Sequence, residues 1–166
     1  MARYGEAMVG DALKAQFAAR REGFFDIELQ PKLWQCADIQ PFYAGKVWTQ
    51  VKFTAPPPDA VAVESGIYMF VVAPHCAALS DHSYIFYVGK ATNLRQRYRR
   101  YLLEKEGRVD HPRERVVRFL NHFDGFVYFH FTLVPAADLD RAEGLLKDNL
   151  TPYANTQVDV VGRLVT

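Results

Sequence analysis

Two apolar segments that lie close together in the chain constrain its fold more than any other feature. The first has the sequence GIYMFVVA and covers residues 66–73, and the second, YIFYV, covers residues 84–88. Both are rich in β-branched and aromatic residues, which favour β-strands. Because only residues 74–83 separate them, the two segments predict an antiparallel hairpin.

Helix and strand signals after this hairpin predict the rest of a small α/β domain. Asn93 is a suitable N-cap for a helix over residues 94–104. Pro112 suits the first turn of a second helix over residues 112–123. Residues 125–134 predict a third strand and residues 136–150 a third helix. We therefore expect an α/β fold with a three-stranded, mostly antiparallel sheet flanked by helices.

Three consecutive prolines divide the chain into two parts. They lie within residues 55–59, and because proline fixes φ and lacks a backbone N–H, this stretch predicts a stiff linker. We expect an N-terminal extension over residues 1–60 and a main domain over residues 61–166. Within the extension, apolar residues repeat every four positions and predict a helix over residues 8–21, and a short strand is expected at 24–29.

Composition argues against several classes of protein. There is no run of about 18 or more apolar residues, so we expect no membrane-spanning segment and no membrane partner. The first ten residues lack the basic-then-apolar order of a secretory signal. The two cysteines, Cys36 and Cys76, do not indicate a disulfide framework, and none of the five histidines has zinc-ligand spacing. These features predict a cytoplasmic protein.

Charge is distributed unevenly, although the chain as a whole is nearly neutral. Residues 87–118 contain ten basic and four acidic side chains, which gives this stretch +6 while the whole chain carries +1. A local field of this kind attracts phosphate groups even on a neutral protein. The alternative is a solvated helix surface, which is the commoner origin of such a charge run.

Five short sequence elements occur in an order that resembles the GIY-YIG nuclease family. A single tripeptide of this kind carries little weight, but five elements in the right order are specific. The resemblance covers residues 64–157, and the interval between the two motif tyrosines is longer than in many members of the family. The elements are GIY at 66–68, YVG at 87–89 with valine in place of isoleucine, KATNLRQR at 90–97, RAEGLL at 141–146 and TPYAN at 151–155.

The resemblance implies a catalytic metal ion and a pair of catalytic tyrosines. It makes Glu143 the ligand of Mg²⁺, with Mn²⁺ as a substitute, and magnesium often needs only one or two carboxylates. It implies that Tyr68 helps to deprotonate the attacking water and that Tyr87 supports the site. A phenol with a pKa of about 10 needs nearby positive charge for that role, which Lys90, Arg97 and the metal are expected to supply. Outside this motif context, Glu143 would be an ordinary solvent-facing glutamate.

Further residues are expected to contact the substrate or to hold the site together. Arg97 and Tyr101 are four residues apart and share one face of the predicted helix. Arginine offers paired donors to phosphate oxygens, so we assign Arg97 to the scissile phosphate and Tyr101 to a supporting or substrate contact. Asn155 is expected to bond to the backbone or to a tyrosine. Nucleic-acid binding is assigned to Lys90, Arg95, Arg99 and Arg100, although solubility explains the last three arginines equally well.

These features predict a compact, stand-alone, metal-dependent endonuclease that hydrolyses phosphodiester bonds in DNA rather than RNA. Restriction-like and structure-specific cutting both remain open. Because two cuts in a duplex need two active sites or two encounters, a homodimer is one expectation, and residues 1–60 are candidates for DNA recognition or the dimer contact. One alternative is a nucleic-acid-binding module that keeps the fold without turnover. The other is a partner-docking module with an exposed apolar stripe at Val9, Leu13 and Phe17.

Overall fold

A four-stranded antiparallel sheet forms the centre of the computed structural model, which describes residues 37, 39–41, 45–73 and 83–155. The strand order is β1-β4-β2-β3. The α/β class and the antiparallel arrangement predicted from the sequence are confirmed, and the sheet has one strand more than expected. The strands are β1 (Thr49–Lys52), β2 (Gly66–Val72), β3 (Tyr84–Ala91) and β4 (Val127–Leu133).

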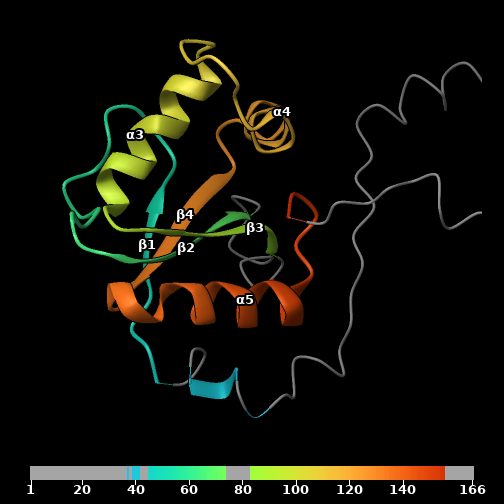
Figure 1. Ribbon diagram of the computed structural model, residues 1–166. Coiled ribbons are helices and arrows are strands. Elements are labelled where there is room, and N and C mark those ends of the chain that lie inside the picture. The colour runs from blue at the N-terminus through green and yellow to red at the C-terminus, as the bar shows by residue number, and fades with distance from the viewer. Residues whose placement is uncertain (1–36, 38, 42–44, 74–82, 156–166) are drawn as a thin grey trace, which may run out of the picture.

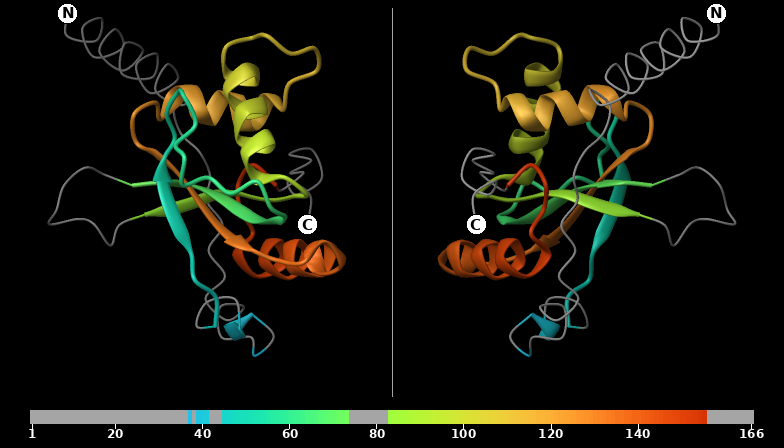
Figure 2. Two further views of the ribbon diagram at one scale, coloured as in Figure 1. Left: turned by 90° about the vertical axis from the view of Figure 1, so that its left-hand side faces the viewer. Right: turned by 90° about the vertical axis from the view of Figure 1, so that its right-hand side faces the viewer.

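Helices cover both faces of this sheet. Helices α3 and α4 lie on one side and α5 lies on the other, as the views in Figure 1 and Figure 2 show. A single 3₁₀ turn, η3, leads directly into α5. The bounds are α3 (Leu94–Lys105), α4 (Glu114–His122), η3 (Ala136–Asp138) and α5 (Leu139–Leu150).

Strand β2 lies between β4 and β3 and is buried on both faces. This position explains its continuous apolar sequence, because a strand covered on both sides has no solvent-facing residues to alternate with. Successive side chains point to opposite faces. Tyr68 and Phe70 therefore pack under α3, whereas Ile67 and Met69 pack against the side covered by α5.

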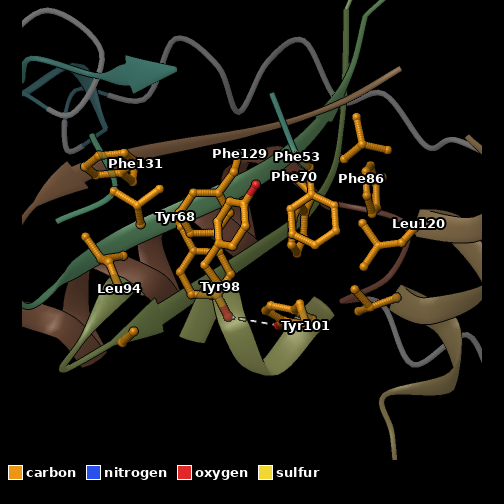
Figure 3. Packing of buried hydrophobic residues seen from close by; sticks show 14 of the residues in the cluster. Phe53, Tyr68, Phe70, Phe86, Leu94, Tyr98, Tyr101, Leu120, Phe129 and Phe131 are labelled. Atoms are coloured by element: carbon orange, nitrogen blue, oxygen red, sulfur yellow. Dashed lines mark hydrogen bonds between the residues drawn. The ribbon is translucent and has the colours of Figure 1, made fainter. Parts of the chain in front are cut away.

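The two faces of the sheet carry cores of different character. The face under α3 and α4 is aromatic. Phe86 and Phe119 stack with ring centroids 3.7 Å apart. Phe70 and Phe129, both labelled in Figure 3, meet edge to face at 5.5 Å. The face under α5 is mainly aliphatic. Edge-to-face and offset aromatic pairs are favoured in addition to the area they bury. The aromatic core therefore fixes the position of α3 on the sheet.

The fourth strand comes from the segment that precedes the three prolines. β1 pairs with β4, and Val51 lies opposite Phe129. Beyond the strand, the backbone N–H of Thr54 donates a hydrogen bond to the Tyr98 hydroxyl on α3 at 2.7 Å. The proline stretch therefore does not separate β1 from the sheet. Prolines exclude ladder hydrogen bonds at their own positions, but they do not prevent the chain on either side from joining one fold.

Local signals for α3 agree with the structure. The side chain of Asn93 accepts a hydrogen bond from the backbone N–H of Gln96 at 2.8 Å, which is the expected capping contact. Past the last turn, Gly107 has a φ of +70°, a left-handed conformation that favours glycine. These two residues fix where the helix begins and ends, and with it the placement of Arg97 and Tyr101.

Some predicted features lie outside the described residues. They include the helix at 8–21 with its stripe of Val9, Leu13 and Phe17, the strand at 24–29, and both cysteines, Cys36 and Cys76. Among the helices that are described, none is both long and apolar enough to cross a membrane.

Candidate active site

Three tyrosines from β2, β3 and α3 come together on the aromatic face of the sheet. Tyr68 is 1% exposed and Tyr101 is 0% exposed, and their hydroxyl oxygens lie 2.9 Å apart (Figure 3). Tyr87 is partly buried, and its ring centroid lies 6.1 Å from that of each of the other two. The structure thus brings together the three tyrosines that the sequence predicts for the site.

The glycines of the two motifs allow these tyrosines to approach the backbone. A Cβ atom at Gly89 would lie 2.5 Å from both Cζ and Oη of Tyr68 and 2.9 Å from Cε1 of Tyr87. These separations are far inside van der Waals contact. At Gly66, a Cβ atom would collide with the backbone carbonyl oxygen of Thr132 on the neighbouring β4. Packing therefore requires glycine at both positions.

Burial raises the pKa of the two most deeply buried tyrosines, Tyr68 and Tyr101. Burial first, and then the neighbouring Tyr87, raises the pKa of the Tyr68 phenol above its ordinary value. The hydrogen bond with Tyr101 and the charges of Arg97 and Arg113 lower that pKa without outweighing burial. Burial likewise raises the pKa of Tyr101 well above the ordinary value. Ionising Tyr68 therefore requires positive charge beyond that of these two arginines.

Two arginines lie beside the tyrosine cluster. Arg97 is one turn before Tyr101 on α3 and is partly buried. Arg113 directly precedes α4, and its Cζ lies 5.0 Å from the centroid of the Tyr101 ring, as in a cation–π contact. The sequence predicts Arg97 here but not Arg113. Arg113 belongs to a different element, and spacing along one helix gives no signal for it.

A cavity of about 540 Å³ lies beside α3. Residues from the end of β3, from α3 and from the loop before α4 line it. None of the described lining residues is acidic and four are arginines, so the cavity has a positive field that suits phosphate groups. The four are Arg97, Arg99, Arg100 and Arg113, of which Arg99 and Arg100 are predicted to bind nucleic acid.

Arg95, predicted for the same role, has a different environment. Its Nε donates a hydrogen bond to the carbonyl oxygen of Val61 at 2.8 Å, and its Nη2 donates to the carbonyl oxygen of Asp59. It is not among the described residues that line the cavity. These contacts hold the segment after the prolines against the start of α3, which gives Arg95 a structural task.

On the face covered by α5, Lys90 contacts the predicted metal ligand. Its Nζ lies 3.0 Å from Oε2 of Glu143 and also forms an ion pair with Asp140. Lys147, one turn further along α5, has its Nζ 3.7 Å from Oε1 of Glu143. The hydrogen bonds to Asp140 and then to Glu143 raise the pKa of Lys90. Lys90 and Glu143 are thus neighbours, and two lysines surround the carboxylate.

Asn155 lies at the outer edge of β3. Its Oδ1 accepts a hydrogen bond from the backbone N–H of Val88 at 2.7 Å, and its Nδ2 donates to the carbonyl oxygen of Val88 at 2.8 Å. The preceding Ala154 N–H donates to the carbonyl oxygen of Phe86 at 2.8 Å. Of the two partners expected for Asn155, the structure provides the backbone, so this residue positions β3.

Strand β3 links the two groups of site residues. Tyr87 belongs to the tyrosine cluster, whereas Lys90 contacts Glu143 on the face covered by α5. β3 is the last strand of the sheet, so its edge, and not the full width of the sheet, lies between the two groups. The predicted site residues therefore lie on both sides of one edge strand.

The donor set at Glu143 suits a hard cation that keeps most of its water ligands. Among the described residues there is no cluster of three or more His, Cys, Asp and Glu side chains that could enclose a metal ion. Glu143 offers one partly exposed carboxylate, at 16% side-chain exposure. Mg²⁺ is commonly held by one or two carboxylates together with waters and substrate phosphates. The residues present therefore fit magnesium better than zinc or calcium.

Several solved structures similar to this chain are domains of UvrC from Thermotoga maritima. They are GIY-YIG endonuclease domains. The N-terminal domain of UvrC from Thermotoga maritima, bound to magnesium, matches with 22% identity and a TM-score of 0.41 over 58% of this chain and 89% of that one. Two point mutants of that domain, each bound to its catalytic divalent cation, match with 20% and 19% identity, TM-scores of 0.42 and 0.40, and coverage of 59% of this chain and 89% of theirs. No protein-family model and no curated protein matches.

Proposed function

We propose that this chain is a divalent-metal-dependent endonuclease of the GIY-YIG type that hydrolyses phosphodiester bonds in DNA. The observation that carries the proposal is the hydrogen-bonded pair Tyr68–Tyr101, which lies next to Arg97 where that residue lines a positively charged cavity. On the other side of β3, Glu143 offers the carboxylate for Mg²⁺ or Mn²⁺. The five sequence elements that resemble the family support the same assignment.

Arg97 and Glu143 have distinct tasks in this reaction. Arg97 binds two phosphoryl oxygens with its paired N–H donors and stabilises the negative charge that grows on them. Glu143 would hold the cation, which would polarise the phosphate and lower the pKa of the water bound to it. The attack of water is in line with the leaving oxygen, and the products are a 5′-phosphate and a 3′-hydroxyl.

The burial of the tyrosines suggests which of them contacts the attacking water. The resemblance assigns that proton to Tyr68, but its side chain is 1% exposed and its pKa is raised by burial. Tyr87 is the least buried of the three and so meets water first. We assign the water contact to Tyr87. The hydrogen-bonded Tyr68–Tyr101 pair then supports Tyr87 through ring packing.

Cleavage assays test this proposal directly. Supercoiled plasmid and end-labelled linear and branched DNA are incubated with Mg²⁺, Mn²⁺ or EDTA, and the same is done with Glu143→Ala. We expect cutting only with metal and a loss of at least about 100-fold in the variant, since a bound cation contributes several kcal/mol to the transition state. Asp140→Ala is the matched control, because it removes the other carboxylate partner of Lys90 and leaves Glu143 in place.

A second candidate function is a nucleic-acid-binding module without turnover. It is favoured by one observation: Lys90 and Lys147 already surround the Glu143 carboxylate, at 3.0 and 3.7 Å. Absence of cutting by the wild type on every substrate, together with DNA binding that does not depend on metal, would establish this module and reject the nuclease. Cutting that survives Glu143→Ala would reject the metal ligand while leaving the nuclease.

A further inference from the structure

Glu104, in the last turn of α3, is a buried carboxylate that binds two arginines. Its side chain is 1% exposed. Its Oε1 accepts a hydrogen bond from Nε of Arg100 at 3.1 Å, and its Oε2 accepts one from the backbone N–H of Arg113 at 3.3 Å. Nη1 of Arg113 lies 3.9 Å from the same carboxylate. Because a buried charge is tolerated only when it is paired, Glu104 fixes the positions of both arginines.

Arg113 is held in place and still has hydrogen-bonding capacity to spare. Its guanidinium lies over the Tyr101 ring, with 37% of the side chain exposed. Its Nη1 is buried and has no hydrogen-bond partner among the described residues. An N–H donor left in this state is costly to the folded protein. A ligand cannot reach this buried atom, so an acceptor oxygen that enters the cavity would meet the exposed part of the Arg113 side chain instead.

The cavity connects Arg113 with the residue assigned to the scissile phosphate. Arg97 and Arg113 both line it, and the exposed Arg100 lies between them along the chain. No described acidic side chain lines the cavity. Glu104, which is not part of the lining, neutralises only part of the positive charge of the arginines. Such a set of guanidinium groups suits a chain of phosphates better than a single one.

We propose that this cavity binds a backbone phosphate next to the scissile phosphate, and that Arg113, fixed by Glu104, is a second phosphate-binding arginine for the same strand. This inference rests on the proposed function, because it takes Arg97 to mark the scissile phosphate. Arg113 is then a substrate-positioning residue: it sets where the strand lies and takes no part in the proton transfer.

Salt-dependent binding tests this role without any cleavage. The full chain carrying Glu143→Ala is titrated with fluorescent duplex DNA by anisotropy at a series of KCl concentrations. Adding Arg113→Gln should make the negative slope of log K against log [KCl] shallower by about 0.9, the value expected for one lost phosphate contact. Arg113→Lys should keep the slope. Arg118→Gln removes an exposed charge on α4, outside the cavity lining, and should leave the slope unchanged.

A chemical measurement on the chain without substitutions tests the same proposal even if the Arg113→Gln chain fails to fold. Phenylglyoxal modifies accessible guanidinium groups, and peptide mass spectrometry reports the rate at each arginine. Bound duplex DNA, kept intact with EDTA, should slow the modification of Arg113 several-fold and leave that of Arg118 unchanged. Equal rates at Arg113 with and without DNA would overturn the proposal, and so would an unchanged salt slope in a folded Arg113→Gln chain.

The outcomes separate this inference from the nuclease proposal. Metal-dependent cutting with no effect of Arg113→Gln on binding would reject the second phosphate site and keep the nuclease. An Arg113-dependent salt slope in a chain that cuts no substrate would support the phosphate site and reject the nuclease.

Discussion

Asn155 and Val88 are joined by two hydrogen bonds in which a side-chain amide reproduces the pairing of a neighbouring β-strand. The amide accepts from the Val88 N–H at 2.7 Å and donates to the Val88 carbonyl at 2.8 Å. An edge strand otherwise presents unpaired backbone groups. The last described residues of the chain thus hold in place the strand that carries Tyr87 and Lys90.

Replacing this amide should weaken both the fold and the site. Asn155→Ala removes both hydrogen bonds to Val88, and we expect a loss of about 1–3 kcal/mol in unfolding free energy together with lower cleavage activity. Asn155→Asp keeps the shape but loses the donor, so it should be about as harmful. Asn121→Ala, at an exposed position on α4, is the control. Urea unfolding measures the effect, and an Asn155→Ala chain as stable as the control would contradict it.

A methyl group at Gly89 should displace the Tyr68 ring. The new Cβ atom would lie 2.5 Å from the Tyr68 hydroxyl, and overpacking of this kind typically costs about 1–3 kcal/mol. Gly144→Ala is a control of opposite sign. It lies on α5 with open space around its Cβ position, and alanine should stabilise the helix by about 1 kcal/mol. Thermal unfolding measures both variants, and a Gly89→Ala chain with a Tm at or above that of the wild type would refute the packing role of Gly89.

The hydroxyl groups of Tyr68 and Tyr101 should be energetically coupled. Either single change to phenylalanine leaves the other buried hydroxyl without its 2.9 Å partner, which costs about 1–3 kcal/mol. The double variant removes both polar groups and should cost less than the sum of the singles by about 0.5–3 kcal/mol. A double-mutant cycle in urea gives this number. Strict additivity would mean that the two hydroxyls do not interact.

Alkaline pH should destabilise the protein through the same two tyrosines. Burial raises the pKa of both phenols, so above pH 10 the unfolded chain releases protons that the folded chain keeps. Their contribution is therefore complete below pH 10 and is lost as the pH rises, by up to about 1.4 kcal/mol per pH unit for each group. Tm measured from pH 8 to 11.5 should fall less steeply in the Tyr68→Phe, Tyr101→Phe chain. Tyr84→Phe, at a site that is 49% exposed, should follow the wild type.

Lys90 should compete with a bound cation at Glu143. Its Nζ lies 3.0 Å from the carboxylate, so its positive charge repels a cation that binds there. Lys90→Met should therefore bind Mg²⁺ about fivefold more tightly, as measured by the rise of Tm with Mg²⁺ concentration. Lys105→Met, which removes the partner of Asp124, should leave Mg²⁺ affinity as it is. Weaker Mg²⁺ binding by Lys90→Met would show that Lys90 supports the cation.

Local sequence signals determined the elements that carry the site. The apolar runs predict the β2–β3 hairpin, Asn93 predicts the start of α3, and the spacing of Arg97 and Tyr101 predicts that they share one face of it. These features depend on the periodicity and caps of a few neighbouring residues, which the chain encodes without reference to the rest of the fold. They explain why Tyr68 and Tyr87, on neighbouring strands, could be expected close together.

Tertiary structure alone decided which distant residues meet. The membership of β1 in the sheet, the carbonyl contacts of Arg95, and the contacts of Arg113 with Tyr101 and Glu104 all join residues from separate elements. Such contacts depend on the path of the chain and on how the helices pack on the sheet. No periodicity, cap or turn within a few residues specifies that path, and so the sequence determined the parts of the site while packing determined its arrangement.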